Sequence, residues 1–241
     1  MLYNPESASN LAVPWFEPRY WIAHGAVVGE ALGRGTTFIV KEGARRLVLR
    51  HYRRGGLAAR ISADRYLWRG ESVTRPFHEL ALIARLYAAG LPVPVPVAAR
   101  YQREGATYRG DIITEYLPDT QSLAQRLAAG PPGLDTWAAI GRCLRRFHDA
   151  GVCHADLNAH NILLRDATTV FLIDFDRGSQ RQPRRTDEHG GEHTGKRTGG
   201  GGLWRDANLV RLRRSLEKLN DQHGDQHFDE LQWHCLLSAY R

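Results

Sequence analysis

Alternating apolar and polar positions dominate the first half of the chain, in stretches that turn residues separate. Residues 27–40 begin and end like strands around a glycine-containing bend, and residues 45–52 alternate again after the Glu42-Gly43 turn. A Pro-rich extended run then leads to a strand on each side of a Gly105 turn, the second of which ends at residues 114–116. Period-two alternation between turn residues is typical of strands, so a β-rich first half is predicted.

One helix is predicted within this half, at residues 74–87, with Thr74 as N-cap and Gly90 as a stop signal. Glu79 lies on its apolar stripe, and a carboxylate in such a place needs a cationic partner. Arg50, at the end of the strand over 45–52, is the candidate. The alternative is an exposed glutamate in the first turn, which the helix dipole favours.

The second half of the chain is predicted to be mainly helical. Residues 135–151 carry apolar side chains on one helical face, with Asp135 as the expected N-cap and Gly151 as the stop. Two amphipathic helices are expected within 208–219 and 227–240, the first with a stripe of leucines. That stripe consists of Leu209, Leu212, Leu216 and Leu219.

Two further stretches depart from these patterns. Residues 178–202 are rich in Gly, Arg, His and Thr and contain almost no apolar residue, which predicts a mobile loop. Near the start of the chain, four aromatic residues are expected to attach the first ordered segment to a core. They are Trp15, Phe16, Tyr20 and Trp21.

Composition adds a bias in charge. The 241 residues carry a formal charge of +7, and arginine is crowded between residues 45 and 75, which favours anionic partners such as phosphates, nucleic acid or an anionic membrane surface. No RNA-binding motif accompanies this basic segment, and nothing implies a protein partner. We expect no signal peptide and no spanning helix, so any membrane contact is expected to be peripheral. Three widely spaced cysteines without a CxxC pair favour reduced thiols in the cytosol.

The stretch with the most specific chemistry is HADLNAHN, residues 154–161, followed by IDFD at 173–176. It has the order H-x-D-x-x-x-x-N of the catalytic loop in protein-kinase-like phosphotransferases. Phosphoryl transfer needs a carboxylate that orients the attacking hydroxyl, and hard oxygen ligands for Mg²⁺ on the nucleotide. Asp156 is the candidate for the first role, and Asn161 and Asp174 are the candidates for the second.

The residues between the two metal candidates predict how they meet. Residues 162–164 and 170–174 are short apolar stretches on either side of a polar turn, as in a hairpin. Antiparallel pairing places the start of the first strand beside the end of the second, so Asn161 and Asp174 are expected at one rim. The alternative is that both are ordinary turn formers.

Groups for the nucleotide are expected upstream. Gly33 and Gly35 lie at the bend of the first hairpin, as in a loop that covers phosphates, although Phe38 replaces the third glycine of the kinase pattern. Arg50 stands where a kinase strand carries its phosphate-pairing Lys, and arginine can bind phosphate oxygens in a bidentate way. Glu115 and Tyr116 end the strand before Pro118, at an expected hinge whose backbone could contact an adenine.

These motifs occur together in a recognisable order. GRGT, VLRHYRRGG, TRPFHE, GLPVP, HADLNAHNIL, LIDFDR and NLVRLRRSL closely resemble the bacterial 3-deoxy-D-manno-octulosonic acid (Kdo) kinases, which are related to heptose kinases of the lipopolysaccharide core. The resemblance runs from about Trp15 to Tyr240. It implies a truncated protein-kinase-like enzyme that uses ATP to phosphorylate Kdo, at the 4-hydroxyl, on a lipid A precursor at the cytoplasmic face of the inner membrane. The resemblance also implies that an arginine at position 50, in place of the kinase lysine, is usual for this family.

The sequence therefore predicts an α+β, two-lobed, protein-kinase-like fold. Residues 1–116 would form a small β-rich N-lobe and residues 117–241 a reduced helical C-lobe, with ATP and Mg²⁺ between them. The rivals of the same fold are a core heptose kinase and a kinase for a small alcohol or an aminoglycoside. A catalytically dead binding module is disfavoured by the intact Asp156, Asn161 and Asp174. A protein kinase is disfavoured by the small C-lobe without an APE-like segment.

Overall fold

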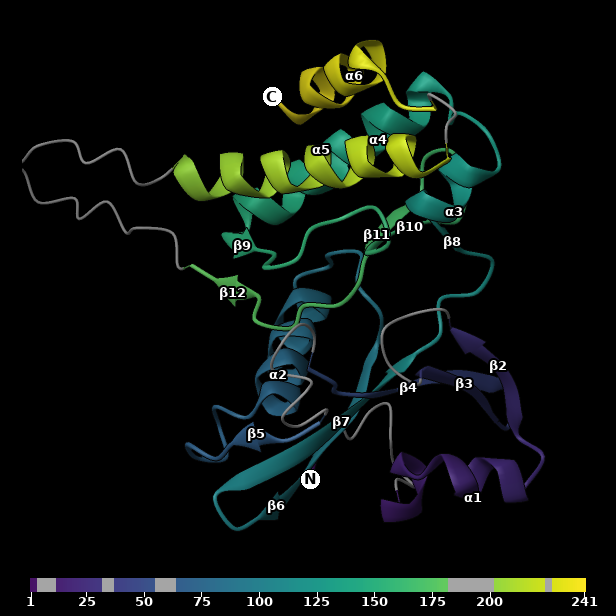
Figure 1. Ribbon diagram of the computed structural model, residues 1–241, viewed down its shortest axis with the longest axis vertical. Helices are drawn as coiled ribbons and strands as arrows, with labels where there is room; N and C mark the ends of the chain where they lie inside the picture. The colour runs from purple at the N-terminus through teal and green to yellow at the C-terminus, as the bar shows by residue number, and fades with distance from the viewer. Residues whose placement is uncertain (4–11, 32–36, 55–63, 182–201, 224–226) are drawn as a thin grey trace, which may run out of the picture. The chain divides into compact units, whose positions relative to one another are not determined.

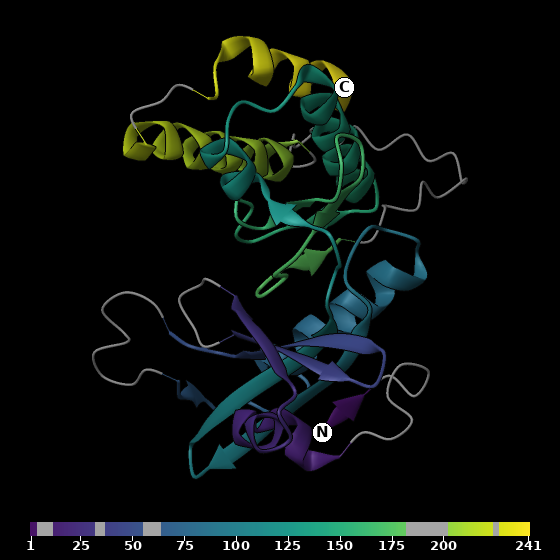
Figure 2. The same ribbon diagram turned by 90° about the vertical axis from the view of Figure 1, so that its right-hand side faces the viewer.

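The computed structural model describes residues 1–3, 12–31, 37–54, 64–181, 202–223 and 227–241. The chain divides into two compact units, Met1–Pro118 and Asp119–Arg241. The elements within each unit can be followed in Figures 1 and 2, and the two units are treated separately below.

An antiparallel sheet forms the first unit. The described residues give it seven strands, in the order β1-β6-β7-β4-β3-β2, with β5 paired to β7. The strands are β1 (Leu2–Tyr3), β2 (Val27–Ala31), β3 (Thr37–Glu42), β4 (Arg45–His51), β5 (Tyr66–Leu67), β6 (Pro96–Glu104) and β7 (Thr107–Glu115). The predicted strands are all present, and the predicted turns at Gly43 and Gly105 are confirmed, since both glycines adopt the positive φ that a turn can require.

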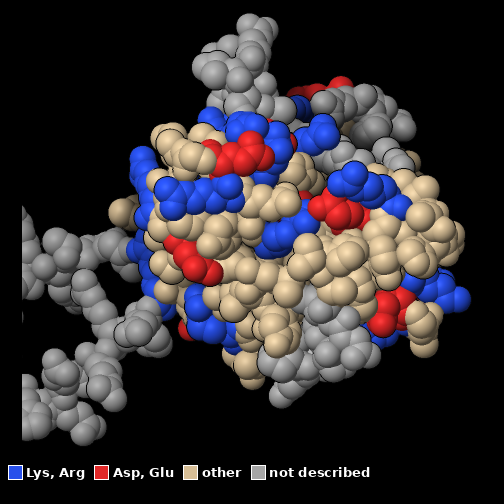
Figure 3. Space-filling view, turned by 90° about the horizontal axis from the view of Figure 1, so that it is seen from below, with Lys and Arg blue, Asp and Glu red and all other residues tan. Residues whose placement is uncertain are grey.

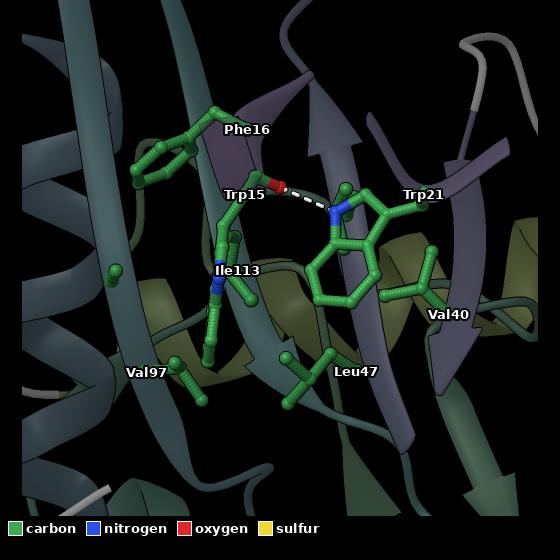
Figure 4. Packing of buried hydrophobic residues seen from close by; sticks show 9 residues of the cluster. Trp15, Phe16, Trp21, Val40, Leu47, Val97 and Ile113 are labelled. Carbon is green, nitrogen blue, oxygen red and sulfur yellow. Dashed lines mark hydrogen bonds between the residues drawn. The ribbon is translucent and has the colours of Figure 1, made fainter. Parts of the chain in front are cut away.

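Aromatic side chains from the start of the chain form one core of this unit. They come from the 3₁₀ helix η1 (Val13–Phe16) and from α1 (Pro18–Ala23), and they pack on Val40, Leu47 and Ile113 of the sheet (Figure 4). Trp21 Nε1 donates a hydrogen bond to Trp15 O at 2.7 Å, so the buried indole N–H is paired. The predicted attachment of this segment to a core is confirmed.

Helix α2 (Arg75–Ala88) packs against β6 and β7 of the same sheet. Thr74 is the N-cap residue as predicted, but its hydroxyl donates to Glu71 O at 2.7 Å and makes no cap bond to the helix. Gly110 of β7 lies so close to the start of α2 that a Cβ there would be 2.7 Å from Pro76 Cγ. The contact between helix and strand therefore depends on a residue without a side chain.

Four helices belong to the second unit within the described residues: α3 (Leu123–Ala128), α4 (Leu134–Asp149), α5 (Leu203–His223) and α6 (Glu230–Tyr240). The predicted N-cap of α4 was wrong: Gly133 is the N-cap, and Asp135 lies in the first turn, where its charge favours the helix dipole. α4 packs on α6, and a Cβ at Gly141 would be 2.2 Å from Leu236 O. The predicted leucine stripe of α5 is buried.

Short strands complete this unit. β10 (Ile162–Leu164) pairs with β11 (Val170–Leu172) and with β8 (Gln121–Ser122), while β9 (Val152–Cys153) pairs with β12 (Ser179–Gln180). The prediction of a loop over 178–202 was therefore wrong at its start, because pairing with β9 makes Ser179 and Gln180 a strand. Residues 182–201 lie outside the described residues.

The fold class is confirmed at the level of a mixed α+β protein with an antiparallel N-terminal sheet and helices. None of the three cysteines forms a disulfide. Within the part of the chain that the structure describes, no helix is both long and apolar enough to cross a membrane.

Candidate active site

The segment that carries Asp156 begins where α4 ends. Gly151 adopts a φ of +75°, and a Cβ there would be 2.1 Å from Arg181 O, so this position accepts only glycine without a backbone shift. Arg181 N donates to Gly151 O at 2.9 Å, which continues the β9–β12 pairing. The turn after the helix thus leads the chain directly through β9 into His154.

His154 is buried, with 3% of its surface exposed, and both of its ring nitrogens are hydrogen-bonded. The Asp156 backbone N–H donates to Nδ1 at 3.2 Å, so Nδ1 must be the acceptor, and Nε2–H donates to Ile173 O at 2.9 Å. Burial lowers the pKa of the imidazole, which keeps it neutral and consistent with this tautomer. His154 therefore ties the loop to the segment just before Asp174.

Helix α5 holds the same loop from another direction. Asn208 is buried and pairs twice with the backbone of His154: the His154 N–H donates to Oδ1 at 3.1 Å, and Nδ2 donates to the His154 carbonyl at 3.0 Å. Seven residues further along α5, Ser215 Oγ accepts a hydrogen bond from the Ala159 N–H at 3.2 Å. The sequence reasoning missed both residues. The sequence does carry a signal for them: each is a polar residue directly before a leucine of the α5 stripe. The two lie seven positions apart, which places them on the same face of the helix.

The side chain of Asp156 is exposed while its backbone is fixed. Its carbonyl oxygen accepts from Asn161 Nδ2 at 2.9 Å and from Asn158 Nδ2 at 3.0 Å. The carboxylate therefore projects from a loop that hydrogen bonds hold on several sides. That is the arrangement a general base needs, because its position must not relax when the substrate binds.

Asn161 and Asp174 lie at the same end of the β10–β11 hairpin, as predicted. Ile162 pairs with Leu172, and one step beyond, the Ile173 N–H donates to Asn161 O at 3.0 Å. The predicted second strand ends at Leu172 rather than at Asp174, because Asp174 adopts a left-handed φ of +61°. A non-glycine residue with that φ costs about 1 kcal/mol or more, and such residues cluster at functional sites.

The donor atoms at this end of the hairpin suit a magnesium ion. Asn161 uses its amide nitrogen on Asp156 O, which leaves its amide oxygen as the atom that can act as a ligand, and Asp174 offers a carboxylate. Mg²⁺ prefers such hard oxygens and is commonly held by one or two of them together with substrate phosphates. No group of three His, Cys, Asp or Glu residues suited to a metal ion occurs among the described residues.

In the first unit, the predicted contact between Arg50 and Glu79 is present. Arg50 Nη2 lies 2.6 Å from Glu79 Oε1 and 2.5 Å from Oε2. The Glu79 side chain is 2% exposed and that of Arg50 is 24% exposed. The alternative of an exposed glutamate in the first turn of α2 was wrong.

The other residues predicted to contact the nucleotide are Gly33, Gly35, Glu115 and Tyr116. Gly33 and Gly35 lie outside the described residues, although β2 and β3 on either side do pair as an antiparallel hairpin. Glu115 N donates to Val95 O and Tyr116 N donates to Arg46 O, both at 2.9 Å. Both N–H groups therefore donate to backbone carbonyls of the first unit, and neither is available as a donor to an adenine.

A cavity of about 440 Å³ lies in the first unit beside η1 and α1, and Arg50 and Arg53 are among the residues that line it. Its charged lining consists mostly of mutual ion pairs: Asp111 with Arg100 at 2.8 Å, Arg100 with Glu17 at 2.7 Å and Arg109 with Asp64 at 2.9 Å. A hydrogen bond to Asp111 raises the pKa of His51 in the same cluster. Because these groups satisfy one another, we assign the cluster a structural role.

The groups described here match those that phosphoryl transfer requires: an exposed aspartate on a fixed loop, hard oxygen donors at a hairpin end, and a partly buried Arg–Glu pair. The model of the lipopolysaccharide kinase (Kdo/WaaP) family matches residues 19–190. The chain belongs to this family.

Curated relatives extend the similarity over nearly the whole chain. The 3-deoxy-D-manno-octulosonic acid kinase of Stenotrophomonas maltophilia (strain K279a) is 42% identical over 96% of this chain and 84% of its own length. The enzyme of that name from Haemophilus influenzae (strain PittEE) is 37% identical, over 99% and 95% respectively. The one from Photobacterium profundum is 38% identical, over 93% and 87%.

Proposed function

We propose that the protein is a Kdo kinase, which transfers the γ-phosphoryl group of ATP to a hydroxyl of the Kdo sugar on a lipid A precursor during lipopolysaccharide biosynthesis. One observation carries this proposal: relatives named as Kdo kinases cover nearly the whole chain, including the loop that fixes Asp156. By resemblance the acceptor is the 4-hydroxyl.

Asp156 is the general base in this proposal. Its carboxylate accepts the proton of the attacking sugar hydroxyl while the new bond forms between that oxygen and the γ-phosphorus. The bond from the γ-phosphorus to the β,γ-bridging oxygen breaks, and ADP leaves with the electron pair. The exposed carboxylate on a loop tied to α5 and to Ile173 supports this role.

Nucleotide binding is assigned to the first unit. Arg50, oriented by Glu79, contacts the phosphates, and Gly33 and Gly35 belong to the loop that covers them. Glu115 and Tyr116 lie at the adenine, where only their carbonyl oxygens or side chains are candidates, since their N–H groups bond within the sheet. The bidentate geometry of arginine suits phosphate oxygens.

Asn161 and Asp174 would hold Mg²⁺, which when bound neutralises charge on the transferred phosphoryl group. The fold that combines these roles is a two-lobed, protein-kinase-like one, with residues 1–116 as the nucleotide-covering N-lobe and residues 117–241 as the reduced catalytic C-lobe. We further propose that the enzyme works as a peripheral protein on the cytoplasmic face of the inner membrane, where its acceptor is a membrane lipid.

Purified protein and labelled ATP, offered a panel of acceptors, test the proposal. The panel contains a Kdo-bearing lipid A precursor, the same lipid without Kdo, a heptose-bearing core, an aminoglycoside and a generic protein substrate. Label is expected only on the Kdo-bearing lipid, and Asp156→Asn serves as the inactive control. Transfer to the heptose-bearing core or to the Kdo-free lipid, in preference to the Kdo-bearing one, would contradict the assignment.

A further inference from the structure

The buried carboxylate of Glu79 has a second donor besides Arg50. The hydroxyl of Tyr52 donates a hydrogen bond to Glu79 Oε2. Tyr52 is 4% exposed and Glu79 is 1% exposed, so the interaction is shielded from water. A carboxylate in such a place is stable in its ionised form only when donors surround it, and hydrogen bonds to a charged group are among the stronger ones.

Tyr52 also contacts Arg50 directly. The guanidinium carbon of Arg50 lies 4.9 Å from the centroid of the Tyr52 ring, and Arg50 Nη2 is 3.4 Å from the Tyr52 hydroxyl oxygen. The Tyr52 side chain therefore contacts the Arg50 guanidinium with its ring and the Glu79 carboxylate with its hydroxyl. Cation–π contacts of this kind are stronger when they are withdrawn from solvent.

The backbone explains why Tyr52 reaches both partners. Residues 50 and 52 are two apart at the end of β4, so their side chains leave the chain on the same side. The Tyr52 N–H donates to Gly110 O at 3.0 Å, which extends the β4–β7 pairing by one step beyond His51. Gly110 is also the residue that lets α2, and with it Glu79, approach the sheet.

We infer that Tyr52 is a positioning residue for nucleotide binding: its hydroxyl and ring hold the Arg50–Glu79 pair in the orientation in which Arg50 meets the phosphates of ATP. The inference rests on the role proposed for Arg50 above. The planar guanidinium of an arginine binds phosphate oxygens in a bidentate way only when its fork is aligned with them, so its orientation matters more than that of a lysine ammonium. The hydroxyl and ring of Tyr52 hold the guanidinium in that orientation. A lysine ammonium acts as a point charge and would depend less on such a contact.

The test replaces Tyr52 by phenylalanine, which keeps the ring and its burial and removes only the hydroxyl. Tyr20→Phe is the matched control, because Tyr20 lies on α1 and packs against the aromatic core of the same unit. Loss of one hydrogen bond to a charged group should raise the Kd and the KM for ATP about tenfold in Tyr52→Phe. The KM for the sugar acceptor should not change, and Tyr20→Phe should change neither constant.

A double-mutant cycle then shows whether the hydroxyl acts through Glu79. In a Glu79→Gln background, Tyr52→Phe should change the Kd for ATP far less than in the wild type. An unchanged ATP constant in Tyr52→Phe, an equal change in the constants for ATP and acceptor, or full additivity with Glu79→Gln would overturn the inference.

The role of Arg50 is checked separately, by direct binding of ATP without any acceptor. If Arg50→Met leaves the Kd for ATP unchanged, the assignment of Arg50 to the phosphates fails, and the inference about Tyr52 fails with it. If Arg50→Met weakens ATP binding and Tyr52→Phe does not, only the inference about Tyr52 fails. Because ATP binding is measured directly, the outcome does not depend on which sugar is the acceptor.

Discussion

At the scale of single residues, Asp156 and Asp174 combine a defined backbone with side chains suited to different tasks. The chain bends at Asp174 in a left-handed conformation, whereas the segment at Asp156 is held by hydrogen bonds to its backbone. Asparagine is isosteric with aspartate and, like it, tolerates a positive φ. A change of either residue to Asn should therefore remove charge without disturbing the fold.

We predict that Asp156→Asn lowers turnover by about 10²–10⁴-fold, the usual contribution of a general base. Asp174→Asn should lower turnover by a comparable factor and, in addition, raise the Mg²⁺ concentration needed for half-maximal rate, which Asp156→Asn should not do. Initial rates over a Mg²⁺ series, together with thermal unfolding, measure both effects. A near-normal rate in either variant with normal unfolding would remove the assigned roles.

Asp166→Asn is the matched control in the same hairpin. Asp166 lies in the turn between β10 and β11 and accepts hydrogen bonds from the N–H groups of Thr168 and Thr169, both at 2.8 Å. These bonds lower the pKa of the Asp166 carboxyl to about 2. Its replacement should affect the turn and leave the Mg²⁺ dependence unchanged.

The Arg50–Glu79 pair gives a second prediction at this scale. Removal of either partner leaves a shielded charge without its counter-ion, so a cycle of Arg50→Met and Glu79→Gln should show a coupling of about 1 kcal/mol or more in the free energy of unfolding. Chemical denaturation of the four proteins measures it. Arg50→Lys should keep part of the activity, because the charge remains while the fork geometry is lost.

The exposed pair Arg145–Asp149 on α4 is the control for this cycle. Arg145 Nε lies 2.7 Å from Asp149 Oδ2, but the two side chains are 41% and 50% exposed. Exposed pairs of this kind contribute about 0–1 kcal/mol. If the cycle at Arg50 and Glu79 shows no more coupling than the one at Arg145 and Asp149, burial does not strengthen the former pair.

At the scale of elements, the groups proposed to act in catalysis depend on contacts with helices that are distant in the sequence. α5 begins at Leu203 and reaches back to His154 and Ala159 through Asn208 and Ser215. α2 brings Glu79 to the end of β4. The loop and the strand therefore acquire their geometry from helix packing.

Gly110 tests the dependence on α2. A Cβ in Gly110→Ala would lie 2.7 Å from Pro76 Cγ and 3.0 Å from Pro76 Cδ, and the proline ring cannot rotate away. Overpacking of this kind typically costs about 1–3 kcal/mol, and here it should also displace the start of α2, with a rise in the KM for ATP. Thermal unfolding and ATP titration measure the two effects.

Gly29→Ala is the matched change in the same sheet. Its Cβ would meet Ile39 Cδ1 at 3.6 Å, an ordinary contact distance. The variant should therefore unfold near the wild-type temperature and bind ATP normally. Equal behaviour of the two variants would show that α2 adjusts to the added methyl group without consequence.

At the scale of the whole molecule, charge is the property that bears on the proposed membrane contact. The formal charge is +7, yet Lys and Arg side chains lie mixed with Asp and Glu side chains on the face shown in Figure 3. Among the arginines of the basic segment between residues 45 and 75, Arg45 lies 3.5 Å from Glu42, the Arg54 guanidinium lies over the Tyr66 ring, and Arg60 lies outside the described residues. Arg46 and Arg53 are exposed.

We predict that the protein binds anionic vesicles in a salt-sensitive way, since each basic residue near an anionic surface contributes about 1 kcal/mol and salt screens it. Sedimentation with anionic vesicles should fall as ionic strength rises towards physiological values, and neutral vesicles should bind little protein. Salt-independent binding would contradict the electrostatic mechanism.

Charge reversal identifies the residues involved. Arg46→Glu/Arg53→Glu should reduce vesicle binding, and should impair phosphorylation of a membrane-borne acceptor more than that of a detergent-dispersed one. Arg142→Glu/Arg214→Glu makes the same change in net charge at exposed positions of α4 and α5 and is the control. Equal loss on both forms of the acceptor would place Arg46 and Arg53 at the substrate itself.

The sequence alone determined much of this protein. Strands β3, β4, β6 and β7 and helices α2, α4 and α5 follow from local periodicity and turn residues, because period 2 and period 3.6 are properties of short segments. The order of motifs determined the family and the candidates Asp156, Asn161 and Asp174, because phosphoryl transfer requires those groups at that spacing.

The tertiary structure decided which distant residues meet. The Tyr52–Glu79 bond joins residues 27 apart, and the Asn208–His154 bond joins residues 54 apart. The strand β12 exists because β9 is its partner, in a stretch whose composition indicated a loop. Local patterns cannot specify such partners, because a polar side chain near an apolar stripe looks the same whether it faces solvent or a buried backbone group, and only packing of the whole chain distinguishes the two.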